Sequence, residues 1–128
     1  EFRDISNDRL EKLADAFRLT LSTIARRRQL MFEFKVSSNI SAVACDPQLQ
    51  EIITTNANAL QLKSLKLPSG AAHDTQKMAS IARAGMIFVP SHAGRSHSPA
   101  EWTSWDDIEA GANVLLNTLY QLARGNLR

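Results

Sequence analysis

Histidine, glycine and proline, the residue types that move protons, hold metals and bend the backbone, are concentrated in residues 67–101. This segment contains all three histidines, three of the five glycines and three of the four prolines. Residues 1–66 contain no histidine and no glycine. The sequence therefore predicts that any functional site is built around this late segment.

The first candidate group is the pair His73-Asp74, which follows a glycine-containing turn at Gly70 and begins a predicted helix. A helix N-terminus presents unpaired N–H groups and the positive end of the helix dipole, so this turn could hold a carboxylate or a developing oxyanion. The alternative is structural: Asp74 only caps the helix and His73 is a turn residue. The residue types alone leave both interpretations open.

The second candidate group lies in the polar loop 91–101. A neutral imidazole such as that of His97 is a good ligand for zinc, manganese or nickel, and a carboxylate such as Glu101 could orient the other ring nitrogen. A metal site needs three or more protein ligands, however, so the loop histidines could equally be surface residues. A serine hydrolase built on Ser69 is disfavoured, because the chain has no G-x-S-x-G turn between a strand and a helix.

Composition limits the possible classes of protein. The 128 residues are 44% hydrophobic, which is enough for one domain or two small pieces. A net charge of +2, spread along the chain, argues against a nucleic-acid partner, and the run at 26–28 is typical of solvated cations at a helix end, a phosphate-binding patch being the alternative. A single cysteine, Cys45, excludes an internal disulfide. The single cysteine also favours a cytoplasmic setting. Because no apolar run reaches about 18 residues, we expect a soluble protein without a membrane partner.

Hydrophobic periodicity predicts an α/β fold with a seam near residues 37–46. The predicted helices cover 7–28, 46–60, 74–84 and 104–125, and the predicted strands cover 2–5, 31–36, 62–67 and 86–89. Ligands gather at the carboxyl ends of strands in open α/β sheets. We therefore expect the loops after the last two strands, which carry both candidate groups, to share one rim of the sheet.

Four blocks of sequence resemble a known family. They are SGAAHDTQKMA, MIFVPS, GRSHSPAEWT and DDIEAGANVLLNTLYQLA. In order and spacing they resemble the C-terminal end of the amidase, hydantoinase/carbamoylase family. The resemblance implies the C-terminal part of a zinc-exopeptidase-like α/β sandwich, preceded by the end of an α+β lid domain. Residues 1–41 would end the lid and dimerisation domain, and residues 42–128 would form the C-terminal segment of the catalytic domain of a homodimer.

The same resemblance implies an activity and a set of roles. The activity would be hydrolysis of the carbamoyl C–N bond of N-carbamoyl-L-amino acids or related small ureido compounds by a water activated on two divalent metal ions, which could be zinc, manganese, nickel or cobalt. His97 would be a metal ligand, and Arg3 would grip the substrate carboxylate. The residues expected to line the substrate pocket are Gly70, Ala72 and His73. Asp74 and Glu101 would support these residues without contacting the metal or the substrate themselves.

This chain departs from the family pattern at two positions, and it lacks the region that supplies most of the family's metal ligands. Ala72 replaces a usual glycine, and Arg95 stands where an apolar residue is more common. The remaining metal ligands and the general base come from sequence further upstream in the family, so we expect a C-terminal fragment that is inactive alone. The alternatives are a non-catalytic binding or oligomerisation module, or a relic, and a metallo-exopeptidase that cleaves dipeptides. The sequence leaves the particular ureido substrate and the native metal open.

Overall fold

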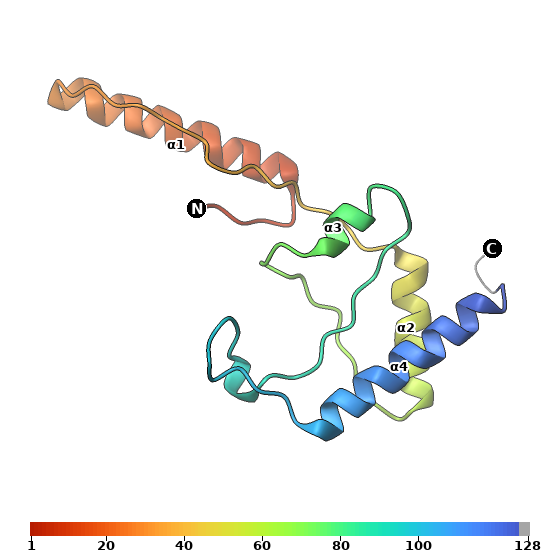
Figure 1. The fold of residues 1–128 in the computed structure, drawn as a ribbon. Helices are drawn as coiled ribbons and strands as arrows, with labels where there is room; N and C mark the ends of the chain where they lie inside the picture. The colour runs from red at the N-terminus through yellow and green to blue at the C-terminus, as the bar shows by residue number, and fades with distance from the viewer. Residues whose placement is uncertain (126–128) are drawn as a thin grey trace. The chain divides into compact units, whose positions relative to one another are not determined.

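The computed structural model describes residues 1–125, whose regular structure is helical (Figure 1). The elements are α1 (Asn7–Arg28), α2 (Pro47–Ala59), α3 (Asp74–Met78), the short 3-10 helix η1 (His92–Gly94) and α4 (Trp105–Ala123). No helix in this described range is long and apolar enough to cross a membrane. The chain divides into unit 1, Glu1–Ala44 with Pro68–Gln76, and unit 2, Cys45–Leu67 with Lys77–Arg128.

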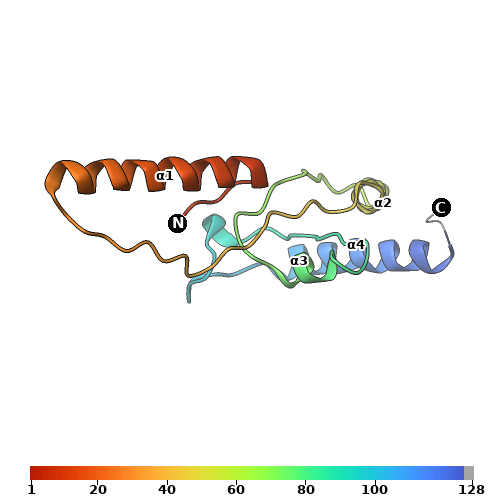
Figure 2. The same cartoon turned by 90° about the horizontal axis from the view of Figure 1, so that it is seen from above.

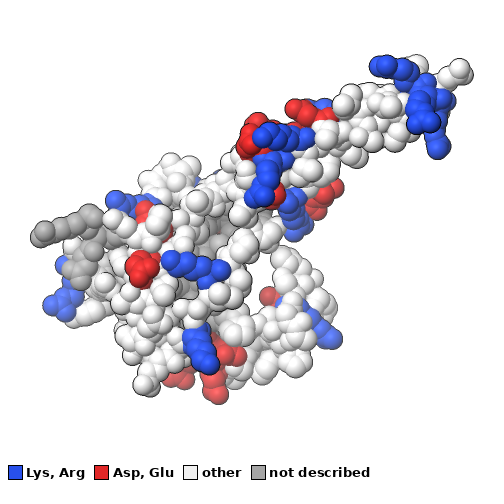
Figure 3. All heavy atoms as spheres, turned by 180° about the vertical axis from the view of Figure 1, so that it is seen from behind, with Lys and Arg blue, Asp and Glu red and all other residues white. Residues whose placement is uncertain are grey.

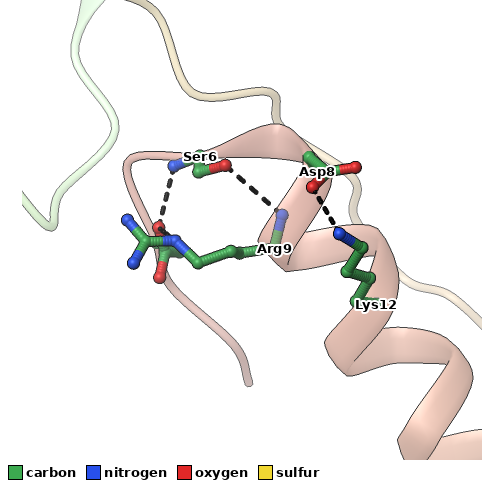
Figure 4. Close-up of polar contacts among 5 residues, drawn as sticks. Ser6, Asp8, Arg9 and Lys12 are labelled. Atoms are coloured by element: carbon green, nitrogen blue, oxygen red, sulfur yellow. Dashed lines mark hydrogen bonds and ion pairs between the residues drawn. The ribbon is translucent and has the colours of Figure 1, made fainter.

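Helix α1 of unit 1 begins where the sequence predicts, because its first residues satisfy the free N–H groups of a helix start (Figure 4). The Oγ of Ser6 accepts a hydrogen bond from the backbone N of Arg9 at 3.4 Å. Asp8 pairs with Lys12 one turn later, at 2.7 Å. At the other end Gln29 closes the helix in the left-handed conformation, and arginines gather at this end of α1 (Figure 3).

The segment that follows α1 runs back along it (Figure 1). The Phe34 ring lies 5.9 Å from the ring of Phe17, and the Arg18 guanidinium lies 5.1 Å above it. Further back, the side chain of Asn7 accepts from the backbone N of Ala42 at 2.7 Å and donates to the carbonyl of the same residue at 3.1 Å. Aromatic contacts and one bidentate amide therefore hold this segment to the helix.

Unit 2 is organised by α2 and α4, which cross each other (Figure 2). Helix α2 begins after the N-cap residue Asp46, whose Oδ1 accepts hydrogen bonds from the backbone N atoms of Gln48 and Leu49, at 2.9 and 3.0 Å. Ala57 of α2 and Val114 and Thr118 of α4 are buried. The Asn56 amide adds a polar contact, donating to Oε1 of Gln121 at 3.0 Å.

The four predicted strands are not formed in residues 1–125. The segments 2–5, 31–36, 62–67 and 86–89 have no regular secondary structure. A strand is defined by hydrogen bonds to a neighbouring strand, so an alternating or apolar run stays unpaired when no partner lies beside it. The helical part of the predicted fold is confirmed, whereas the α/β sandwich is not.

The extent of one predicted helix is also wrong. The helix expected over 74–84 ends at Met78, where the Ser80 hydroxyl donates to the Lys77 carbonyl at 2.7 Å and so takes an acceptor that a continuing helix would use. In α4, the apolar residues Ile108, Leu115 and Leu119 are exposed. The face of α4 that packs on α2 carries the buried residues Val114 and Thr118.

Gly111 provides a test of the packing of α4 against the segment before η1. Glycine inside a helix is normally about 1 kcal/mol less favourable than alanine. Here, however, a Cβ atom at Gly111 would collide with Cγ1 of Val89, and overpacking typically costs about 1–3 kcal/mol. We expect Gly111→Ala to lower the free energy of unfolding, measured by urea denaturation and circular dichroism.

The matched background is Val89→Ala, which removes the colliding methyl groups. In that background Gly111→Ala should be neutral or stabilising, because only the helix propensity remains. A stabilising Gly111→Ala in the parent chain would contradict the observed approach of Val89 to α4.

Candidate functional site

In unit 1 the fold brings Arg3 to the turn at residues 69–73, which we call the 69–73 turn. Nη1 of Arg3 donates to the carbonyl oxygen of Gly70 at 2.9 Å, although the two residues are 67 positions apart. Nε of the same guanidinium donates to Oε1 of Glu1 at 2.9 Å. Two residues that the sequence analysis assigns to substrate binding are thus in direct contact.

The guanidinium of Arg3 is permanently charged and accessible. The hydrogen bond from Arg3, together with its positive charge, lowers the pKa of Glu1, and the same pair raises the pKa of Arg3. Both side chains are more than half exposed, so solvent screens the pair and it adds little to stability. The pair therefore leaves Arg3 able to meet an incoming anion.

His73 closes the 69–73 turn and is held on both its side chain and its backbone. Its Nε2 lies 2.8 Å from Oγ of Ser69, which also accepts from the N of Ala71 at 3.2 Å. The backbone N of His73 donates to Oε1 of Gln76 at 3.2 Å. Ala72 is exposed on the same turn.

Gln76 is a residue that the sequence analysis did not single out. It occupies the third position of α3, counted from Asp74, and reaches back to the N–H of the residue that precedes the helix. This is the second half of a capping box, and a glutamine three residues after the cap is its sequence signal. Asp74 itself is exposed at the first position of α3.

In unit 2 His97 lies in a loop that is closed by its own residues. Its Nδ1 is 2.7 Å from Oγ of Ser96, and its backbone N donates to Oε2 of Glu101 at 2.8 Å. His97 has a backbone φ of 55°, in the left-handed region that residues other than glycine seldom adopt. The expectation that Glu101 orients the imidazole is therefore wrong in detail: the carboxylate holds the backbone of His97, and Ser96 contacts the ring.

The remaining loop residues anchor this structure. The backbone N of His92 donates to the carbonyl of Trp102 at 2.7 Å, and the two rings meet edge to face at 6.5 Å. The Ser91 hydroxyl donates to the carbonyl of Arg95 at 2.6 Å. His92 thus packs within the loop.

The predicted site residues fall into two groups. Arg3 and the 69–73 turn lie in unit 1, whereas His97 and Glu101 lie in unit 2. Within residues 1–125 no three histidine, cysteine, aspartate or glutamate side chains gather in a way that could hold a metal ion. A two-metal centre needs more ligands than the single imidazole of His97, so the described residues do not fit a complete metal centre.

Comparison with known proteins establishes the class. Residues 8–121 match the family described as Peptidase family M20/M25/M40, so the chain belongs to this family. Among its relatives, an N-carbamoyl-L-amino acid amidohydrolase of Geobacillus stearothermophilus is 35% identical over 98% of this chain and 31% of its own length. A ureidoglycolate hydrolase of Arabidopsis thaliana is 33% identical over 94% of this chain and 26% of its own length.

A solved structure has the same fold over the shared region. The crystal structure of AtUAH in complex with glyoxylate superposes with a TM-score of 0.82 at 32% sequence identity, covering 94% of this chain and 29% of the other. The chain therefore spans about a third or less of the length of the proteins it matches. The predicted relation to carbamoyl- and ureido-hydrolysing enzymes is confirmed.

The role of Glu101 can be tested on the His97 loop. We expect Glu101→Ala to speed hydrogen exchange at the His97 amide about tenfold, because a hydrogen bond to a charged acceptor is lost. Glu101→Gln retains an amide oxygen as acceptor and should exchange nearly as slowly as the parent chain. The measurement is amide exchange followed by NMR.

Glu109→Ala is the control for this experiment, since it removes an exposed carboxylate from α4. Equal exchange rates at His97 in Glu101→Ala and Glu109→Ala would contradict the proposed role of the Glu101 carboxylate in holding the loop.

Proposed function

We propose that the complete protein containing this chain is a metal-dependent amidohydrolase that cleaves the carbamoyl C–N bond of N-carbamoyl-L-amino acids or related ureido compounds. The observation that carries this proposal is the contact of the Arg3 guanidinium with Gly70 in the 69–73 turn, at 2.9 Å. It joins a cation suited to a substrate carboxylate to a turn with free backbone donors. The names of the relatives support the same substrate class.

The hydrogen bonds that are already made show which donors remain for a ligand. Arg3 uses Nε and Nη1, and Nη2 has no partner within unit 1. In the 69–73 turn the N–H groups of Ala71 and His73 are bonded, whereas those of Gly70 and Ala72 have no acceptor in that unit. A planar guanidinium and exposed backbone N–H groups are the donors that carboxylates and carbamoyl oxygens accept from. Arg3, Gly70, Ala72 and His73 are therefore the proposed substrate-binding residues.

His97 is the proposed metal ligand of this chain, with Glu101 supporting its loop and Asp74 supporting the 69–73 turn. Because Nδ1 of His97 faces Ser96, its Nε2 is the atom we propose for the metal, which could be zinc, manganese, nickel or cobalt. The other ligands and the general base would come from residues that this chain does not contain. We further propose a cytoplasmic homodimer whose lid domain ends near residue 41.

The predicted strands belong to this proposal as well. In the complete protein, segments 62–67 and 86–89 would pair with strands from the rest of the catalytic domain and form the α/β sandwich. The exposed apolar residues of α4, among them Leu115 and Leu119, would then pack on that sheet.

A second candidate function is a metallo-exopeptidase that cleaves dipeptides. The description of the family as peptidases favours it, and the terminal carboxylate of a dipeptide could be held by Arg3 in the same way. Assaying N-carbamoyl-L-amino acids, a ureido acid and dipeptides on the complete protein separates the two functions. Preference for dipeptides would overturn the amidohydrolase proposal.

Arg3 offers a direct test of substrate binding. Arg3→Lys keeps the charge but loses the fork of donors, so we expect KM for an N-carbamoyl-L-amino acid to rise about tenfold or more. Arg27→Lys, at the exposed end of α1, is the matched control and should leave KM unchanged. Steady-state kinetics of the complete protein provide both values, and an unchanged KM in Arg3→Lys would contradict the proposed role.

Metal binding gives a second test. We expect the isolated 128-residue chain to bind no more than one zinc ion, weakly, and to release no amino acid from an N-carbamoyl-L-amino acid. His97→Ala should remove the bound zinc, as measured by metal analysis after dialysis. Tight binding of two metal ions by the isolated chain would overturn the proposal that the other ligands lie elsewhere.

A further inference from the structure

The amide of Gln76 joins the 69–73 turn to a distant part of unit 1. Its Oε1 accepts from the backbone N of His73 at 3.2 Å, and its Nε2 donates to the carbonyl of Ser41 at 3.1 Å. Ser41 lies 35 positions away, in the segment that the sequence predicts as the seam between two domains. One partly buried side chain therefore connects the seam to the turn.

This bridge is one of two long-range ties that fix the turn to the rest of unit 1. The seam is itself held to the start of α1, through the two hydrogen bonds between Asn7 and Ala42. At its other end the turn is held by Arg3, which donates to the Gly70 carbonyl. The turn is thus fixed near both ends, once by a charged side chain and once through the neutral pair of Asn7 and Gln76.

Only a side-chain amide of this length can make both bonds of Gln76. The amide oxygen accepts from one N–H and the amide nitrogen donates to one carbonyl. An ionised glutamate has two acceptor oxygens and no donor, so one of its oxygens would be repelled by the carbonyl oxygen of Ser41. Alanine would leave the His73 N–H and the Ser41 carbonyl without their partner.

We propose that Gln76 is a positioning residue for substrate binding, which holds the 69–73 turn in register with the N-terminal segment through Ser41. The inference rests on the proposed function, in which this turn lines the substrate pocket. Gln76 itself does not contact the substrate. It acts by fixing the N–H groups of Gly70 and Ala72 and the ring of His73, whose placement within about 1 Å affects binding and rate.

The first experiment measures kinetics of the complete protein with Gln76→Ala and Gln76→Glu. Loss of positioning should raise KM about tenfold with a much smaller change in kcat, because binding is weakened more than the chemical step. Gln61→Glu, at an exposed glutamine in unit 2, is the matched control. An unchanged KM in both Gln76 variants would overturn the inference.

The second experiment is a double-mutant cycle between Asn7 and Gln76. If both act on the turn through the seam, Asn7→Ala and Gln76→Ala together should raise KM by much less than the product of their separate effects. Arg3→Lys acts at the other end of the turn and should combine with Gln76→Ala more nearly multiplicatively. Multiplicative effects for Asn7 and Gln76 would contradict a shared path through Ser41 and Ala42.

A failure of the positioning role of Gln76 can be distinguished from a failure of the proposed function. Kinetics are measured with whichever substrate the complete protein hydrolyses, so activity on dipeptides overturns the proposed substrate class while Gln76 is still tested. If no substrate is turned over, hydrogen exchange of the peptide covering residues 69–76 decides. Faster exchange in Gln76→Ala than in Gln61→Glu supports the tie to the turn, and equal exchange overturns it.

Discussion

The packing of α2 against α4 is the interaction on which unit 2 depends. Its buried residues are few and small, with Ala57, Val114 and Thr118 at the crossing and Leu49 close to Gly85. Many large apolar side chains elsewhere are exposed, including Met31 and Trp105. Burial of apolar surface is the main favourable term in folding, so helices of this composition are suited to a larger protein than the described residues. The chain spans about 30% of the length of these relatives.

The two candidate site groups depend on a different kind of interaction. Their loops are held by short-range polar contacts, such as Ser69 with His73, Ser96 with His97 and Glu101 with the His97 backbone. These partners lie within four residues of each other, so the loops need no neighbouring sheet to close. In unit 1, the contacts of Arg3 and Gln76 add the long-range ties that place the 69–73 turn. Polar contacts with fixed geometry thus give local order where the apolar core is small.

The starts of the helices were predictable to within one residue. Ser6, Asp46 and Ser104 each accept from N–H groups of the first turn, and caps of this kind are visible in a sequence. The end of α3 was missed, because the Ser80 hydroxyl competes for a helix carbonyl. The strands were not formed, because a sheet depends on partners that periodicity cannot supply. Of the site, the motif around His97 was recognisable, whereas the backbone role of Glu101 was not.

The sequence by itself determined the family, the capped helices and the residue types of the candidate site, because motifs and caps are local in the chain. The tertiary structure decided which face of α4 is buried and that Arg3 meets Gly70. It also decided that Gln76 reaches both His73 and Ser41. The physical reason is the same in each case: a contact between residues 35 or 67 positions apart depends on the path of the backbone between them. Spacing along the chain does not record that path.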